Sequence, residues 1–174
     1  MNRDEFRQRL DDIIKTQDIS VHIEMIETLR EKYNHSIMLK HAILPGQSEF
    51  RCYEYAFDLV DWQEHELAKV LEGFAQGHRD FIWFLICAQI LKTIDRCSVT
   101  SGDVAIYFSE SDLLHAGKYD SGKIVTKWGK GHVWEHGLWE VPTSYGARVK
   151  WYAKPSPQDM KLSVGRYEEY LYNL

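Results

Sequence analysis

The spacing of the apolar residues changes near residue 100, and this change limits the possible folds more than any other feature. In the first part, to residue 97, apolar side chains recur every three to four positions, as Phe6, Leu10 and Ile13 do. This is the period of an amphipathic helix. Between residues 102 and 154, short runs of β-branched and aromatic residues alternate with turn residues, which is typical of strands. Helices followed by consecutive strands predict an α+β fold.

The same patterns predict the individual elements. After the first helix, the pattern predicts a second over residues 20–33 with Ser20 as its N-cap. It also predicts a short helix that starts at Cys52 and further helices over 64–74, 80–95 and 163–171, with 80–95 the most buried. Strands are expected over 104–108, 113–119, 124–128 and 148–153, with a hairpin turn at Ser121-Gly122.

The length of 174 residues suits one domain. We divide it into an N-terminal helical part (1–47), a core (48–154) and a C-terminal helical tail (155–174). The net charge of -5 argues against a nucleic-acid partner, because phosphate binding needs a basic face. The sequence contains no apolar run long enough for a membrane span and no secretory leader at its polar start, so we expect a cytoplasmic protein. The oligomeric state is left open.

The chain contains three cysteines, Cys52, Cys87 and Cys97. Their odd number and the absence of a CxxC pair argue against a disulfide framework or a thiolate zinc site. Cys87 lies in the apolar run 81–87 and is expected in the core. Cys97 has no nearby base in the sequence. Cys52 is the candidate nucleophile, because a cysteine at a helix N-terminus beside an imidazolium has a lowered pKa.

Two further motifs follow Cys52 in order. Gly102-Asp103 opens a predicted strand, and His115-Ala116-Gly117-Lys118-Tyr119 forms the next one. This order and spacing resemble those of NlpC-type peptidases and CHAP amidases, over residues 48–128. The resemblance implies a papain-like fold, in which N-terminal helices pack on an antiparallel sheet of about four to six strands.

The resemblance also implies site residues. Cys52 would be the nucleophile and His115 the base, with the third catalytic residue at Thr126 or Lys127 on the following strand. Neither is the His, Asn, Gln or Glu that is usual at that position. Apart from the resemblance, the N–H of Cys52 at the helix start is expected to face the oxyanion, and Gln47, from its position just upstream, to donate a second hydrogen bond to it. The predicted activity is hydrolysis of a peptide or amide substrate through a thiolate–imidazolium pair, with no cofactor.

Two alternatives remain open at this stage. The chain could be a non-catalytic binding module in which Cys52 and His115 are structural. His132-Val133-Trp134-Glu135-His136 also fits the H-x-x-E-H zinc motif, although that motif needs a helix and this segment favours a strand. We interpret residues 129–146 as a flap over a cleft, because long connections are often functional. The substrate-binding residues are then expected to be Trp128, His132 and Trp134.

Overall fold

The architecture is a seven-stranded antiparallel sheet with helices on both faces. The computed structural model describes residues 2–44, 50–60 and 77–173. The strand order is β1-β6-β5-β4-β3-β7-β2, and every neighbouring pair is antiparallel. The strands are β1 (Met38–His41), β2 (Thr93–Ile94), β3 (Val104–Phe108), β4 (Leu113–Asp120), β5 (Lys123–Lys127), β6 (Val133–His136) and β7 (Arg148–Tyr152).

The α+β class and the antiparallel sheet confirm the expectation from sequence. All four expected strands are present, as β3, β4, β5 and β7. The sheet is larger than expected because β1, β2 and β6 were not predicted. These three strands are at most four residues long, too short to produce a clear alternation in sequence.

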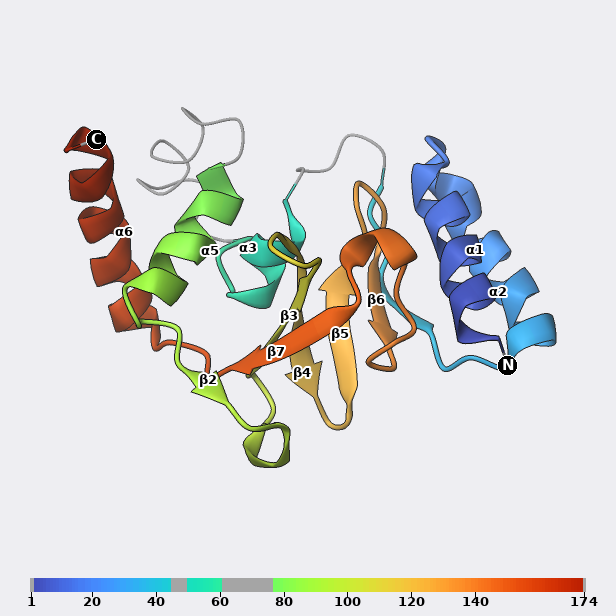
Figure 1. Cartoon of the computed structure of the whole chain (residues 1–174). Helices are drawn as coiled ribbons and strands as arrows, with labels where there is room; N and C mark the ends of the chain where they lie inside the picture. Colours follow the sequence, from blue (N-terminus) through green and yellow to red (C-terminus); the bar gives the residue numbers. More distant parts are fainter. Residues whose placement is uncertain (1, 45–49, 61–76, 174) are drawn as a thin grey trace.

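The helices divide between the two faces of the sheet (Figure 1). Helices α1 (Arg3–Lys15) and α2 (His22–Tyr33) cover one side, which we call the α1 face. Helices α3 (Cys52–Ala56), α5 (Gly77–Cys87) and α6 (Pro157–Tyr172) cover the other, which we call the α3 face. The side on which a residue of the sheet lies therefore decides which helices it meets.

The alternation along β3 separates the two cores. Ile106 packs with the helices of the α3 face, whereas Tyr107 packs with those of the α1 face. In the β3–β4 ladder, Ala116 lies opposite Ile106 and His115 opposite Tyr107. Because directly opposite residues of an antiparallel pair point to the same face, Ala116 faces α3 and His115 faces α1.

Two predicted helix boundaries are wrong. Ser20 is not the N-cap of α2: it lies inside a 3-10 turn (Ile19–Val21) that Asp18 caps, its carboxylate accepting hydrogen bonds from both the N–H and the hydroxyl of Ser20, and the N-cap of α2 is Val21. Helix α2 therefore begins only at His22.

Helix α5 ends at Cys87, where residues 80–95 were expected to be helical. Gln89 has a positive φ of 57°, and the N–H groups of Ile90 and Leu91 both donate to the carbonyl of Leu85. This cap turns the chain away from the helix axis. Cys87 is consequently exposed, so its predicted place in the core is also wrong.

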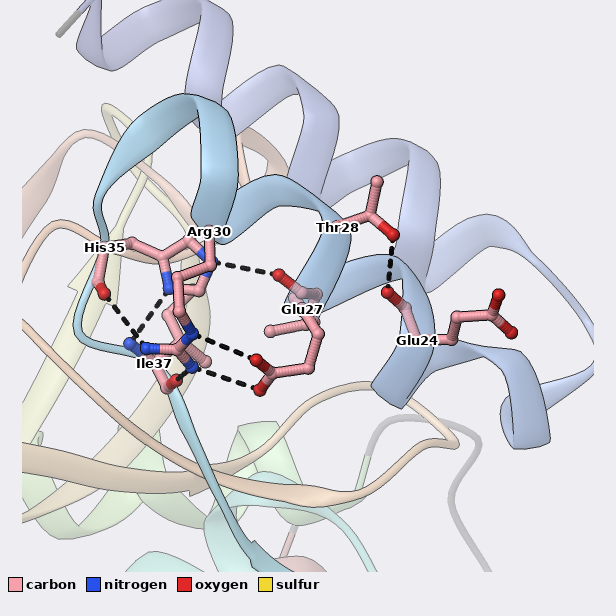
Figure 2. Close-up of polar contacts among 7 residues, drawn as sticks. Glu24, Glu27, Thr28, Arg30, His35 and Ile37 are labelled. Atoms are coloured by element: carbon pink, nitrogen blue, oxygen red, sulfur yellow. Dashed lines mark hydrogen bonds and ion pairs between the residues drawn. The ribbon is translucent and has the colours of Figure 1, made fainter.

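A side-chain network fixes the path from α2 into β1 (Figure 2). The Arg30 guanidinium forms two hydrogen bonds to the Glu27 carboxylate, at 3.0 and 3.1 Å. It also donates to the carbonyls of His35 and Ile37, at 3.3 and 2.6 Å. The His35 imidazole bonds the carbonyl of Ile26 at 3.0 Å. These bonds tie residues 35–37, which follow the helix, to side chains and backbone of α2.

The predicted terminal helix is present and longer than expected. Pro157 and Ser156 start α6, with the Ser156 hydroxyl accepting from the Asp159 N–H. Among the residues that the structure describes, no helix has the length and apolar character needed to cross a membrane. The helix expected over 64–74 lies outside the described residues.

Candidate functional site

The site lies where the ladder between β4 and β5 stops. The strands pair at Lys118↔Val125 and at two further positions next to the Ser121-Gly122 turn, which is the predicted hairpin. Both strands continue beyond Lys118 and Val125, yet within these described segments no further ladder pairs form between them. We call this opening, between His115–Gly117 of β4 and Thr126–Lys127 of β5, the break.

The Thr126 side chain occupies the break. Its hydroxyl donates to the carbonyl of Ala116 at 2.6 Å and lies 3.1 Å from His115 Nε2. A hydroxyl has one proton, so toward the imidazole it acts as the acceptor and Nε2 carries the hydrogen. Nδ1 of His115 is then the unprotonated nitrogen, the one able to act as a base.

Cys52 approaches the same break from the α3 face. The carbonyl of Ala116 faces β5, and in a strand the N–H of a residue points to the same side as its carbonyl. This Ala116 N–H lies close to the Cys52 sulfur, together with the N–H groups of Tyr53 and of Cys52 itself. The sulfur and the imidazole therefore meet the same residue of β4, one at its N–H and the other near its carbonyl.

The predicted contact between the Cys52 sulfur and the His115 imidazole is absent from the described hydrogen bonds. His115 extends from the α1 face and Cys52 from the α3 face, so the sulfur and the imidazole reach the break from opposite sides. The described hydrogen bonding of His115 goes to Thr126, and no bond joins it to Cys52.

The charge state expected for this pair also differs from the prediction. Burial raises the pKa of the Cys52 thiol to about 11, against the favourable influence of nearby N–H groups and Lys127. Burial lowers the pKa of His115 well below its ordinary value, and His136 lowers it further. Helix α3 is only five residues long, so it offers little dipole to counter the loss of water. At rest the pair is a neutral thiol and a neutral imidazole.

Alternation along β5 separates the two candidates for the third catalytic position. Thr126 lies on the His115 side, whereas Lys127 lies on the Cys52 side. The Lys127 ammonium donates to the carbonyl of Gly129 at 2.7 Å and lies 5.3 Å from the ring centre of Phe50. Of the two, Thr126 is the residue that touches the imidazole. Gln47 lies outside the described residues.

The residues expected to line a cleft are part of the core. Trp128 and Trp134 are 1% exposed, and their ring centres are 5.7 Å apart. His132 is buried, with Nδ1 accepting from the Ile43 N–H and Nε2 donating to the carbonyl of Ile19, both at 3.0 Å. The predicted substrate-binding role of these three side chains is therefore wrong.

The segment 129–146 is not a flap. Its middle part forms β6, which is held inside the sheet between β1 and β5. His132 and His136 lie on this extended segment, where four residues span about 13 Å, too far for a shared metal ion. Within the described residues, no group of three or more His, Cys, Asp or Glu side chains is placed to hold a metal.

Tyr145 is a site residue that the sequence did not reveal. It ends the 3-10 turn η4 (Thr143–Tyr145), and its ring stacks on His115 with centres 3.8 Å apart and an interplanar angle of 16°. In the sequence it is one of ten tyrosines, and it lies 30 positions after His115. A Pro-x-x-x-Gly turn around it was the only signal.

A separate cavity of about 340 Å³ lies at the start of α6. Its lining includes Lys92, Lys154, Arg166 and Asp159, and none of its residues belongs to the break. Lys154 is ion-paired with Asp58. We do not assign the candidate chemistry to this cavity, because it contains neither the sulfur nor an imidazole.

No protein family, curated protein or solved structure shows significant similarity to this chain. The likeness to NlpC-type and CHAP enzymes therefore rests on the Cys52, Gly102-Asp103 and His115–Tyr119 motifs alone.

Proposed function

We propose that this chain is a cysteine-dependent amide hydrolase, a peptidase or amidase with Cys52 as nucleophile and His115 as base. The observation that carries the proposal is the break. It brings the Cys52 sulfur to the N–H of Ala116, the residue directly after His115, while Thr126 holds the imidazole Nε2 beside the Ala116 carbonyl. Catalytic hydrogen bonds are often long in an empty site and shorten when substrate binds.

The neutral resting state favours general-base catalysis over a preformed ion pair. His115 Nδ1 removes the thiol proton as the sulfur attacks the substrate carbonyl carbon. Carbonyl π electrons move to oxygen, and the N–H of Cys52 faces the resulting oxyanion. The imidazolium then gives its proton to the leaving amine as the C–N bond breaks, and water hydrolyses the thioester. Thr126 keeps Nε2 protonated throughout, which leaves Nδ1 for both proton transfers.

Activity and acylation test this proposal directly. The probes are a panel of fluorogenic aminoacyl coumarin amides and peptidoglycan stem peptides, followed by fluorescence and mass spectrometry. We expect turnover and an acyl group on Cys52, both abolished in Cys52→Ala. His115→Asn should reduce turnover by about 10³-fold or more. Cys87→Ser is the matched control, since Cys87 is exposed and outside the break, and it should behave like the wild type.

Alkylation adds an internal comparison. Because burial raises the pKa of Cys52 to about 11, iodoacetamide at pH 7.5 should label the exposed Cys87 and Cys97 at least ~10-fold faster than Cys52. Fast labelling of Cys52 would contradict the neutral resting thiol.

The second candidate is a non-catalytic binding module. It is favoured by one observation, the approach of the sulfur and the imidazole from opposite faces of the sheet. Failure of every amide in the panel to acylate Cys52, in protein whose folding is verified by circular dichroism, would exclude the hydrolase and leave this module.

A further inference from the structure

Three buried side-chain atoms have no hydrogen-bond partner within the described residues, and all three belong to the α1 face. They are Trp128 Nε1, His136 Nε2 and the hydroxyl of Tyr145. A buried polar group without a partner destabilises the folded state, so each calls for an explanation. Only Tyr145 is stacked directly on His115.

The surroundings of the Tyr145 hydroxyl include Gly129 and Cys52. The backbone N–H of Gly129, just beyond the end of β5, is close to this oxygen, although the two do not meet hydrogen-bond geometry. Cys52 also acts electrostatically on the Tyr145 hydroxyl, which places the two groups within range of each other. The ring covers the imidazole, and its hydroxyl is buried without a hydrogen-bond partner among the described residues.

Helix α1 holds Tyr145 in this position. The Arg7 guanidinium donates to the carbonyls of Val141, Pro142 and Gly146, at 2.9, 3.1 and 2.6 Å. The Asp11 carboxylate accepts from both the N–H and the hydroxyl of Ser144. Both charged side chains are buried, at 6% and 4% exposure. We call these contacts the α1 clamp.

Close packing removes the remaining freedom of this turn. Gly146 has a φ of 107°, and a Cβ built there would lie 2.3 Å from the carbonyl oxygen of Phe108. The residue after Tyr145 is therefore pressed directly against β3. A side chain fixed so firmly, with an open hydrogen-bond group, is preorganised to bind another molecule.

We propose that the Tyr145 hydroxyl donates a hydrogen bond to the substrate carbonyl oxygen at the break. This inference rests on the proposed hydrolase function, for which it supplies a donor in addition to the Cys52 N–H. Burial, and to a smaller extent Cys52, raises the pKa of Tyr145 well above its ordinary value. The hydroxyl therefore stays protonated and able to donate at any working pH.

A reversible peptide aldehyde tests the hydroxyl separately from the thiol. The Cys52 sulfur adds to the aldehyde carbon, the C=O electrons move to oxygen, and the thiol proton neutralises that oxygen. The product imitates the tetrahedral intermediate. Alkylation by iodoacetamide forms no such oxygen.

The variants are Tyr145→Phe, which keeps the stacked ring, and Tyr107→Phe as the control. Tyr107 is also beside His115, but its hydroxyl already donates to the carbonyl of Leu138 at 2.9 Å.

We expect Tyr145→Phe to weaken aldehyde binding at least ~10-fold and to lower kcat about 10²-fold. The iodoacetamide rate of Cys52 should stay within about twofold, and Tyr107→Phe should bind the aldehyde like the wild type. Unchanged aldehyde affinity in Tyr145→Phe would overturn the inference alone. An equal loss in aldehyde binding and alkylation would overturn it too, because the hydroxyl would then only support the fold. If the wild type forms no adduct with the aldehyde, the proposed function fails together with the inference.

Discussion

The two faces of the sheet bury different kinds of side chain. On the α3 face, the core formed with α5 and α6 consists of aliphatic and aromatic side chains, such as Ile106, Phe81 and Tyr167, and the buried charged residues on this side, Glu54 and Lys127, lie on or beside α3. On the α1 face, the core contains buried ionisable groups as well, among them Arg7, Asp11 and His136. Hydrophobic burial needs no defined partner, whereas each buried polar group needs one.

This difference indicates where the molecule is specified by packing and where it is specified by hydrogen bonds. The polar groups of the α1 face are mostly used to fix backbone segments, as Arg7 does with residues 141–146. Among the described residues, three remain unpartnered: Tyr145 stacks on His115, His136 acts electrostatically on His115, and Trp128 lies beside His136. Unpaired groups in such a network are expected at sites with a function and not at random.

The largest effect expected from this comparison is loss of the α1 clamp. Arg7→Ala leaves three buried carbonyls without their donor and should lower the free energy of unfolding by about 3 to 5 kcal/mol. Urea unfolding measures the change. Arg9→Ala on the same helix is the control, because its ion pair with Asp12 is exposed, and it should change stability by less than about 0.5 kcal/mol. If Arg7→Ala lowered the free energy of unfolding as little as Arg9→Ala does, the polar network of the α1 face would be dispensable for stability.

A smaller effect should appear with pH. Burial lowers the pKa of His136 from 6.5 to about 4. Below pH 6.5 the imidazole of His136 binds a proton more readily in the unfolded chain than in the folded one. The contribution of His136 to the free energy of unfolding is therefore fully present above pH 6.5 and is lost as the pH falls toward 4. By pH 5 the loss from His136 is about 2 kcal/mol. His136→Gln should therefore flatten the difference in stability between pH 7.5 and pH 5 by about that amount.

His41→Gln, at an exposed position of β1, is the control for this pH series and should leave the difference unchanged. A difference between pH 7.5 and pH 5 that is the same in His136→Gln and in the wild type would mean that the α1 face responds to acid no differently from the α3 face.

The smallest effect compares one glycine at the break with one on α6. A Cβ on Gly117 would lie 2.4 Å from Ile124 Cγ2 and 3.0 Å from Thr126 Cβ, so Gly117→Ala should destabilise by about 1.5 kcal/mol. A Cβ on Gly165, inside α6, meets nothing within 4 Å. Gly165→Ala should stabilise by about 0.5 to 1 kcal/mol through helix propensity. Thermal unfolding of both variants checks the opposite signs, and equal signs would contradict the close approach at the break.

The sequence predicted the elements whose apolar pattern is long. The four expected strands and helices α1, α2 and α3 lie within a few residues of where their periodicity placed them, whereas α6 begins at Pro157, six residues before its predicted start. The errors have local causes. Asp18 caps a 3-10 turn that contains Ser20, so Ser20 does not cap α2, and the turn at Gln89 ended α5 before its apolar pattern ended. The edge strand β1 pairs with β6, almost 100 residues later in the chain, and no local pattern records this pairing.

The site was predictable only as a set of candidates. The spacing of Cys52, His115 and Thr126 led to three residues that do converge on the break, at Ala116. Their charge states depend on how much water they lose, which sequence does not reveal, and both pKa shifts run against the expectation. Tyr145 was missed for a related reason. Its position comes from Arg7, more than 130 residues earlier in the chain, acting on its neighbouring backbone.

The α1 clamp has a consequence for how residues 141–146 can vary. Arg7 binds only main-chain oxygens there, and these are the same for every amino acid. Most side chains of this loop can therefore be substituted while its backbone conformation is kept. In a search for related chains, an arginine at the position of Arg7 should accordingly be a better criterion than the identity of residues 141–146.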